Sequence, residues 1–348
     1  MKIQINPTKL FYVNKKDRVI RMGNFPETGK VIEYEDNFLL DLFEKIKEPI
    51  EFDYLINYIT ERYKVPKSEA EESINYLIEE GFIISNDDLM SILSNDIYSR
   101  ELLYFLMTTN INCLVKFEKI KHKKILVLGL GGIGTIAINL LARAGFDNFV
   151  IVDCDKVEKS NLIRQLLYDY SDIGKLKIEV TEEKLKLINK NIKIESLNKA
   201  IKSESELQPI VEKCEFVLCT VDKPLRIIRR VVNDLCVNLK KPVLFCGFTE
   251  HYGLIGPFVV PGKTACLRCI EKQNEIDESL DNIICVPSYG PLCNIIASIA
   301  ADEIINYFLG YKDNNLEGKT LMYNMINYET KVINWKKDSE CERCRQIW

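Results

Sequence analysis

A glycine-rich turn between an apolar segment and an amphipathic one constrains this chain more than any other feature. The segment KILVLGLGGIG ends in the pattern GxGxxG, with glycine at positions 129, 131 and 134. A strand, such a turn and a following helix bring backbone amides and the helix N-terminus together, where they can bind a phosphate. The next apolar segment, NFVIVD, ends at Asp153, whose carboxylate can accept hydrogen bonds from ribose hydroxyls. The pattern predicts a nucleotide-binding fold and leaves open whether the nucleotide is a redox dinucleotide or one that is cleaved.

The pattern around this turn indicates an α/β fold with a mostly parallel sheet. From residue 123 onward, apolar strands alternate with helical patterns, in the segments KILVLGL, GTIAINLLARAG, NFVIVD, FVLCTVD and KPVLFCGF. Strands and helices that alternate in this way form parallel sheets with helices on both faces. We therefore expect a Rossmann-like domain over residues 96–348.

Residues 1–95 have a different pattern. A β-rich opening, KLFYVNKKDRVIRMG, is followed by amphipathic stretches near 36–48, 52–63 and 67–80. The last stretch ends at Gly81, a common helix stop, before a short apolar strand. These elements predict a small winged-helix-like α+β domain, joined to the second domain by a polar linker near 84–100. Such a domain can bind DNA, a peptide strand or another protein, or it can merely stabilise its neighbour.

Composition narrows the class of protein. The 51 acidic and 47 basic residues are mixed along the chain, for a net charge of -4, so we expect no nucleic-acid partner. The N-terminus lacks an apolar segment of signal-peptide type, and the apolar stretch NIIASIAADEIINYFLG is interrupted by Asp302 and Glu303. We therefore expect a cytoplasmic protein without a membrane partner, whose 12 cysteines are reduced thiols and metal ligands.

Polar residues downstream of the glycine turn favour a nucleotide that is cleaved. Asn161 and Arg164 in SNLIRQ, with Lys177 at the end of GKLK, would place an amide and two cations beside a phosphate chain. Asp222 ends the apolar segment FVLCTVD, at the sheet edge where α/β proteins bind ligands, and could hold Mg²⁺. Hydride transfer needs no such cluster. Each residue taken singly also fits a surface charge or a strand-end cap.

In combination, the segments GLGGIG, VDCDKVEKSNLIRQ, GKLK and CTVD resemble the adenylating domain of the ThiF, MoeB and ubiquitin-activating superfamily. The resemblance implies that AMP is transferred from ATP with release of pyrophosphate. It implies catalytic roles for Arg100, Arg164, Lys177 and Asp222, with Asp222 on magnesium and Lys177 on the α-phosphate. It further implies nucleotide contacts, with Asp153 on the ribose, from Gly129, Gly131, Gly132, Gly134, Asp153, Asp155, Asn161 and Gln165. Arg100 corresponds to an arginine that acts in the neighbouring subunit's site, which implies a homodimer.

The cysteine pairs CLRC and CERC, at 266/269 and 341/344, can supply four thiolates to a structural Zn²⁺. Spacing alone also permits redox pairs, and the resemblance to ThiF- and MoeB-like chains favours zinc on Cys266, Cys269, Cys341 and Cys344. Cys285 lies near the place where ubiquitin-activating relatives carry a thioester cysteine, but no matching motif surrounds it. We expect the remaining cysteines to be core residues, namely Cys113, Cys154, Cys214, Cys219, Cys236, Cys246 and Cys293.

The layout of the whole chain is similar to the MccB-like branch of the superfamily. An N-terminal extension, YSR, the adenylating segments, IGPFVVPGKTACLRC and a terminal CxxC occur in that order. The resemblance implies that the C-terminal residue of a short, ribosomally made peptide is adenylated in antibiotic or modified-peptide biosynthesis. Two alternatives stay open: a ThiF- or MoeB-type activator of a sulfur-carrier protein, and a non-catalytic protein that delivers a leader peptide. The two histidines, His122 and His251, form no hydrolase motif.

Overall fold

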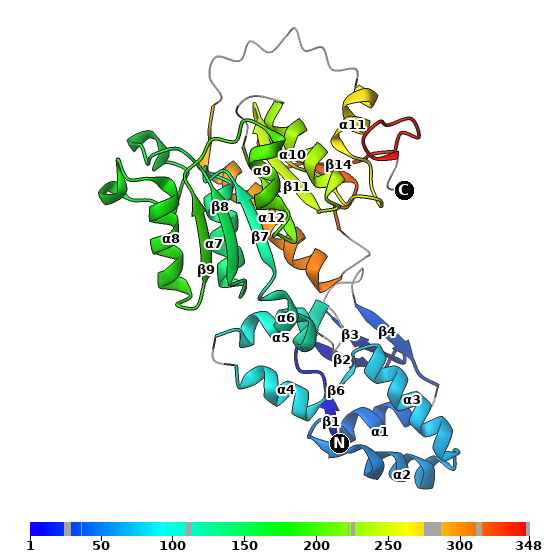
Figure 1. Ribbon diagram of the computed structural model, residues 1–348. Helices are drawn as coiled ribbons and strands as arrows, with labels where there is room; N and C mark the ends of the chain where they lie inside the picture. Colours follow the sequence, from blue (N-terminus) through cyan, green and yellow to red (C-terminus); the bar gives the residue numbers. More distant parts are fainter. Residues whose placement is uncertain are drawn as a thin grey trace. The chain divides into compact units, whose positions relative to one another are not determined.

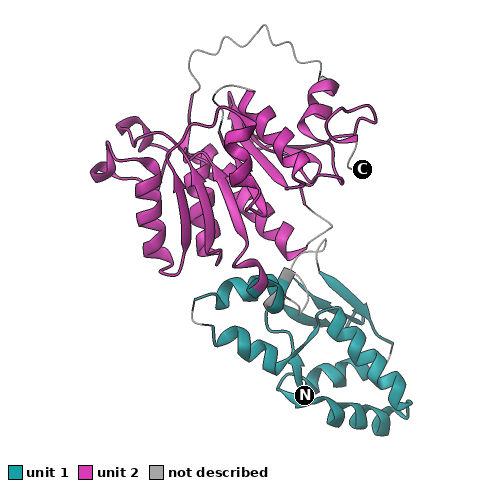
Figure 2. Cartoon of the chain, in the orientation of Figure 1, with its two compact units in different colours: residues 1–118 teal, residues 119–348 magenta. Residues whose placement is uncertain are grey.

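The computed structural model describes residues 1–23, 29–35, 37–95, 97–108, 113–221, 223, 227–274, 287–310 and 315–345. The chain divides into two compact units, Met1–Glu118 and Lys119–Trp348, called unit 1 and unit 2 (Figure 2). The expected division near residue 95 into domains with separate roles stays a prediction. The fold class is confirmed, since an α+β unit precedes an α/β unit built on a mostly parallel sheet (Figure 1).

Unit 1 contains two small antiparallel sheets. In the first, β1 (Lys2–Ile5) lies between β5 (Ile50–Glu51) and β6 (Ile83–Ser85). The second consists of β2 (Phe11–Asn14), β3 (Val19–Met22) and β4 (Lys30–Glu33) in sequence order. The strands expected in the opening segment are therefore present, as β2 and β3.

Three helices of unit 1 form where amphipathic stretches predict them, as α1 (Phe38–Lys45), α2 (Phe52–Tyr63) and α3 (Lys67–Glu79). Their apolar faces meet β1 and β3 in one core that includes Ile3, Phe43, Ile59 and Ile74. Gly81 follows α3 with φ at +73°, a conformation that glycine adopts without strain.

The prediction of a polar linker near 84–100 is wrong, because most of this segment is helical. It contains α4 (Asn86–Leu93), whose Leu89 and Ile92 are buried, and the start of α5 (Ser99–Thr108). These two buried residues anchor α4 in unit 1, although the rest of the stretch is polar and only weakly periodic. Unit 1 continues into α6 (Cys113–Ile120), which runs across the division between the units.

Unit 2 is built on one sheet of eight strands in the order β14-β13-β12-β11-β10-β7-β8-β9 (Figure 1). The strands from β11 to β9 run parallel, and β12, β13 and β14 extend the sheet with antiparallel pairs. Their bounds are β7 (Lys124–Leu128), β8 (Asn148–Val152), β9 (Lys193–Leu197), β10 (Phe216–Cys219), β11 (Val243–Thr249), β12 (Tyr252–Val259), β13 (Lys319–Asn324) and β14 (Thr330–Asn334).

Helices cover both faces of this sheet, as the alternating pattern predicts. They are α7 (Gly134–Arg143), α8 (Lys177–Ile188), α9 (Glu204–Val211), α10 (Ile227–Asn238), α11 (Leu267–Asn274) and α12 (Gly290–Leu309). Successive residues of a strand face opposite sides of the sheet, and β10 illustrates this. Val217 packs in the cluster that contains α9 and α10 residues, whereas the ring of Phe216 contacts Tyr307 and Phe308 of α12.

Helix α12 is long and apolar enough to cross a membrane, and it is the one such helix among the described residues. However, 56% of its most apolar window is buried inside the structure. It contacts α7, β11 and β12, and Gly253 of β12 admits Leu292 and Ile296 at close range. The apolar composition of α12 is therefore explained by its place in the core of unit 2.

Replacing Asp41 by asparagine should destabilise unit 1, because Asp41 connects α1 to α2. Its carboxylate accepts hydrogen bonds from the hydroxyls of Tyr58 at 2.5 Å and Tyr63 at 3.1 Å, and it pairs with Arg62 at 2.8 Å. We expect Asp41→Asn to lower the free energy of unfolding by about 1–2 kcal/mol at pH 7 in urea denaturation.

The pH dependence of this loss provides the control. The hydrogen bond from Tyr58, then that from Tyr63 and the charge of Arg62, hold the pKa of Asp41 below its usual range. A lowered pKa stabilises the fold above the unfolded-state pKa, and this stabilisation disappears as the pH falls through the folded-state pKa. The difference between wild type and variant should therefore shrink below about pH 4. Glu72→Gln, an exposed change on α3, should show no such difference at any pH.

Candidate functional site

A pocket of about 630 Å³ opens at the carboxyl edge of the parallel strands of unit 2. Residues at or just after the ends of β7, β8, β9 and β10 line it, together with the first turns of α10. Five residues predicted from the sequence are among its lining residues, namely Gly129, Gly131, Asp153, Asp155 and Lys177. Carboxyl ends of parallel strands meet at one edge, which explains why residues from distant segments gather here.

Two of the glycines are required by the turn itself. Gly129 has φ at +93°, and a Cβ there would lie 2.9 Å from Cγ1 of Val221. A Cβ at Gly134 would lie 1.9 Å from the carbonyl oxygen of Gly129, so that only glycine can occupy the start of α7. These contacts bring the glycine turn directly against the end of β10.

The other two glycines have different surroundings. No described atom lies within 4 Å of a Cβ built at Gly131, so its backbone faces open space. A phosphate could approach the peptide groups at this position. At Gly132, a Cβ would instead lie 2.9 Å from Sγ of Cys293 and 3.4 Å from Cγ of Arg164. This brings Arg164 beside the glycine turn.

The carboxylate of Asp153 organises the turn and the segment after β8. One oxygen accepts the amide of Leu130 at 2.7 Å, and the other accepts the amide of Asp155 at 2.8 Å. Both bonds use backbone groups, which holds the side chain at the pocket wall. A carboxylate held here suits the recognition of ribose hydroxyls, although this role stays a prediction.

Lys177 is a buried cation whose partner is exposed. Its side chain is 7% exposed, and its ammonium donates at 2.9 Å to Asp155, whose side chain is 64% exposed. The hydroxyl of Tyr168 lies 3.4 Å from the carbonyls of Leu130 and Lys177, which links the glycine turn to the start of α8. A cation kept from water and paired with an accessible carboxylate can exchange that partner for a phosphate.

Three residues of SNLIRQ are not among the lining residues in the described part of the chain. Asn161 is buried, and its side-chain oxygen accepts the amide of Glu158 at 3.1 Å within a short 3₁₀ turn. Arg164 donates to the carbonyl of Ser160 at 2.9 Å. Gln165 is 2% exposed, and its Oε1 has no hydrogen-bond partner among the described residues. The nucleotide contacts assigned to the three residues stay predictions.

The structure does not connect the remaining two predicted residues to the pocket. Asp222 lies outside the described residues, although its neighbours Val221 and Lys223 line the pocket. Arg100 is exposed on the first turn of α5 in unit 1. Their assigned roles therefore also stay predictions.

The segment after β9 lines the pocket but was not predicted from the sequence. Ala200 and Ile201 form an apolar wall with residues of β8 and α10, and Lys199, Lys202 and Lys223 add cations to the pocket lining. The apolar wall suits a planar base, and the cations suit an anionic ligand. The same rule about strand ends could have found this segment, but the mixed sequence of β9, KIESL, did not identify it as a strand.

One cysteine prediction is wrong. Cys154 is exposed and lines the pocket between Asp153 and Asp155, whereas we expected a core residue. Because Cys154 follows the end of β8, its side chain lies on the wall of the pocket and not in the core. Cys214, Cys219, Cys236, Cys246 and Cys293 are buried as expected, and Cys285 and the side chain of Cys113 lie outside the described residues.

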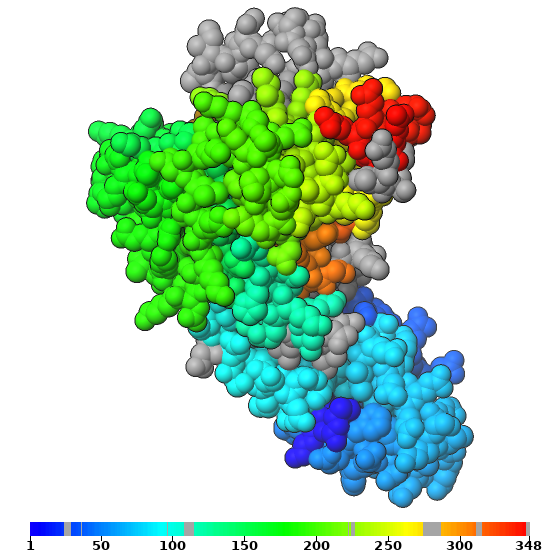
Figure 3. Space-filling view, viewed as in Figure 1, coloured from blue at the N-terminus to red at the C-terminus, as the bar shows by residue number. Residues whose placement is uncertain are grey.

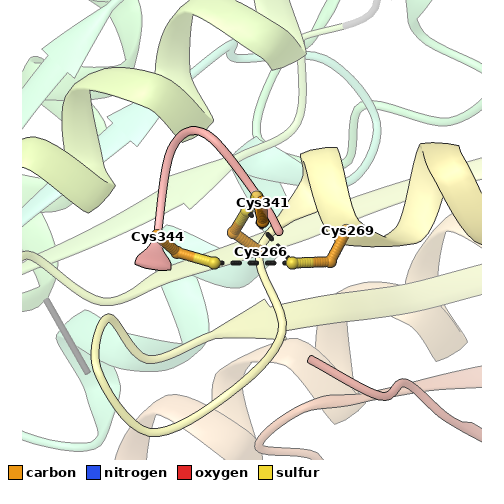
Figure 4. A group of neighbouring side chains, drawn as sticks. All are labelled: Cys266, Cys269, Cys341 and Cys344. Atoms are coloured by element: carbon orange, nitrogen blue, oxygen red, sulfur yellow. Dashed lines mark hydrogen bonds between the residues drawn. The ribbon is translucent and has the colours of Figure 1, made fainter. Parts of the chain in front are cut away.

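The two CxxC pairs come together in space, as predicted. The four Sγ atoms lie within 4.8 Å of one another, and all four residues are buried (Figure 4). Sγ of Cys266 lies 3.8 Å from that of Cys269 and 3.6 Å from that of Cys341, and Sγ of Cys269 lies 3.4 Å from that of Cys344. Tetrahedral Zn²⁺ with Zn–S bonds of about 2.3 Å requires Sγ atoms about 3.8 Å apart. The cluster fits a structural zinc ion, whereas a disulfide would need sulfurs about 2 Å apart.

Charged contacts hold the C-terminal segment beside this cluster. Asp234 of α10, which is 2% exposed, pairs with Arg268 at 2.7 Å and with Arg343 of the tail at 3.2 Å. Lys272 of α11 pairs with Asp338 at 2.7 Å. In Figure 3 the tail (red) lies against the region of α11 (yellow). The cluster therefore fastens two segments that are far apart in the sequence.

The strand-end pocket and the cysteine cluster occur in a chain with known relatives. The ThiF family model matches residues 102–343. This chain belongs to the ThiF family. The molybdopterin-synthase adenylyltransferase of Escherichia coli is 29% identical over 66% of this chain and 90% of its own length. The sulfur carrier protein ThiS adenylyltransferase of Escherichia coli is 27% identical over 65% of this chain and 88% of its own length. As a ThiF-family protein with such relatives, the chain is an ATP-dependent adenylyltransferase.

Solved structures extend the likeness of this ThiF-family chain to its N-terminal unit. The structure of E. coli MccB with ATP matches 99% of this chain and 100% of its own, with a TM-score of 0.81 and 22% identity. The structure of PaaA matches 94% of this chain and 99% of its own, with a TM-score of 0.71 and 20% identity. At these identities the likeness shows the fold alone.

Cys154 should report nucleotide binding to the pocket. Desolvation and the charges of Asp155 and Asp153 raise the pKa of its thiol above the usual value. The thiolate is the reactive form, so labelling by iodoacetamide should accelerate roughly tenfold per pH unit between pH 7 and 9. ATP should slow labelling in proportion to the fraction of pockets it fills, as measured by peptide mapping. Buried Cys214 should stay unlabelled throughout, and ATP binding without protection of Cys154 would contradict the site.

Loss of one cluster cysteine should unfold the tail. The protein as purified should contain one zinc per chain by elemental mass spectrometry. Cys341→Ser should remove that zinc and lower the free energy of unfolding by about 4 kcal/mol or more, as loss of a structural metal does. Cys154→Ser is the matched control and should retain the zinc. A zinc-free protein with a disulfide inside either CxxC pair would support the redox alternative.

Proposed function

We propose that this enzyme transfers AMP from ATP to the C-terminal residue of a short ribosomally made peptide, in the biosynthesis of an antibiotic or another modified peptide. The observation that carries the proposal is the match of the whole chain to MccB, including unit 1. Structures of MccB with MccA and with N-formylated MccA have the same likeness, with TM-scores of 0.82 and 0.80.

Unit 1 separates this proposal from its main alternative. The relatives that activate molybdopterin synthase or ThiS match only about two thirds of this chain, 66% and 65%. The ThiF family model begins at residue 102, so most of unit 1 lies outside it. An antiparallel sheet can bind an extended peptide by adding it as a strand at an edge. In unit 1 the edge strands are β5 and β6 of one sheet and β2 and β4 of the other. Because β6 is buried throughout, the candidates for such an edge are β2, β4 and β5.

The chemistry of the pocket suits attack on the α-phosphate. A carboxylate or amide oxygen of the peptide forms a bond to the α-phosphorus, and the bond to pyrophosphate breaks. Negative charge then spreads over phosphate oxygens, and fixed cations stabilise it. Lys177 and Arg164 are the residues to which we assign this role, and Asp153 would hold the ribose. The apolar wall around Ala200 and Ile201 would accept the base.

Two further components belong to the proposal. Asp222 would hold a Mg²⁺ ion, which neutralises phosphate charge when bound. A homodimer would supply Arg100 to the neighbouring site. Unit 2 exposes large apolar side chains suited to such an interface, with Ile163 at 69%, Leu166 at 66% and Leu187 at 80% exposure. We place the enzyme in the cytoplasm, where the described cysteines, all free, would remain reduced.

Mass spectrometry tests the proposal directly. The enzyme, ATP and Mg²⁺ are incubated with synthetic peptides encoded by short reading frames beside the gene. We expect one such peptide to gain the mass of AMP, or to lose water after activation. Arg164→Ala and Lys177→Met should slow this change about 100-fold or more, because each removes a cation that stabilises the transition state. Lys186→Met changes an exposed lysine of the same helix, α8, and should leave the rate unchanged.

The other outcomes identify the alternatives. If a small protein ending in Gly-Gly is adenylated and no peptide reacts, the enzyme is a sulfur-carrier activator. If a peptide binds but stays unmodified with ATP present, the chain is a delivery protein. Full activity of Arg164→Ala would overturn the assignment of Arg164 to the phosphates of ATP.

A further inference from the structure

The first turn of α12 packs against the glycine turn and the segment that contains Arg164, although no motif pointed to it. Cys293 of this turn is fully buried. Its Sγ lies 2.9 Å and its Cβ 3.3 Å from the place of a Cβ at Gly132. Burial raises the pKa of the Cys293 thiol, and the charge of Arg164 opposes that rise. Cys293 therefore lies close to both the glycine turn and Arg164.

A second contact joins the same two segments. A Cβ at Gly290 would lie 2.7 Å from the carbonyl oxygen of Ile163 and 3.6 Å from Cα of Arg164. Neither Gly290 nor Gly132 has a positive φ, so neither position needs glycine for its backbone conformation. The absence of a side chain at these positions instead permits the backbone of α12 to approach the Ile163–Arg164 segment and the glycine turn.

Helix α12 is itself held firmly in unit 2. Gly253 of β12 accepts Leu292 and Ile296 so closely that a Cβ there would lie 3.0 Å and 2.8 Å from them. The helix also packs against α7, which begins at the glycine turn. Its first turn is thus fixed relative to the sheet, and the glycine turn and the Ile163–Arg164 segment pack against it.

We propose that Cys293 is a positioning residue, which sets the distance between the glycine turn at Gly132 and the side chain of Arg164. Without touching the nucleotide, it fixes where the Gly131 amide region and the Arg164 guanidinium lie relative to each other. The head of Arg164 donates to the carbonyl of Ser160, and Cγ of its stem lies 3.4 Å from the place of a Cβ at Gly132. The inference concerns ATP binding and does not depend on which substrate receives AMP.

A reciprocal pair of substitutions tests the inference, with Mg²⁺ and a non-hydrolysable ATP analogue as the probe in calorimetric titration of the full-length enzyme. Gly132→Ala places a methyl group against Cys293 and should weaken binding about tenfold or more. Cys293→Ala should also weaken binding, by about fivefold or more, because the space that Sγ leaves lets the glycine turn and Arg164 shift relative to each other. The double variant should recover to within about threefold of wild type, since the methyl group at position 132 then occupies the space that Sγ leaves.

Two controls separate positioning from a general loss of fold. Gly131→Ala meets no described atom, so any loss that it causes should not be recovered by Cys293→Ala. Thermal unfolding of all variants should remain cooperative. The recovery in the double variant should appear in its affinity for the nucleotide analogue. If the double variant binds as weakly as Gly132→Ala, Cys293 does not set this distance and the inference is wrong. The same conclusion follows if Cys293→Ala alone binds the analogue as tightly as wild type does.

Discussion

The close approach of the glycine turn to the ends of β8 and β10 is the constraint on which the rest of unit 2 depends. The amide of Gly129 bonds the carbonyl of Val152 at 3.0 Å, and the hydroxyl of Thr220 bonds the carbonyl of Gly129 at 2.9 Å. The carboxylate of Asp153 binds the amide of Leu130 on the other side of the turn. With its backbone groups satisfied in this way, the turn can leave Gly131 open toward a ligand.

Two further elements position the loops around that turn. On one side, Tyr168 connects the turn to the start of α8, where Lys177 is held out of water. On the other side, α12 presents Cys293 to Gly132 and Arg164. Cations placed by rigid elements do not need to reorganise when charge develops on a phosphate, which is how fixed groups contribute to catalysis.

The cysteine cluster has a separate role, which is to hold the C-terminal tail, far along the chain from the glycine turn. A tail is poorly ordered unless something holds it, and here four thiols and the ion pairs of Asp234 provide that hold. The indole of Trp335 adds a hydrogen bond by donating to the hydroxyl of Thr320 of β13 at 2.8 Å. The antiparallel strands β12–β14 thereby connect the parallel part of the sheet to the tail.

Local sequence determined the elements whose periodicity is strong and the residues that end parallel strands. The glycine turn and Asp153 could be assigned to one site because β7 and β8 are continuous apolar runs, and Lys177 was added from the segment GKLK and the resemblance that it carries. Spacing alone left the two CxxC pairs open between a metal site and redox pairs, and the resemblance to ThiF- and MoeB-like chains favoured one zinc ion. Reasoning from local sequence failed at β9, where alternating polar residues hid the strand, and at α4, where a polar helix was taken for a linker.

Only the tertiary structure decided which neighbour each residue has. Gly131 and Gly132 are adjacent in the sequence, yet one faces open space and the other faces Cys293, about 160 residues away. Cys154 looked like a core residue and lies on the pocket wall because β8 ends before it. Motifs specify backbone conformation through short-range sterics, whereas burial and packing depend on segments that meet only when the chain has folded.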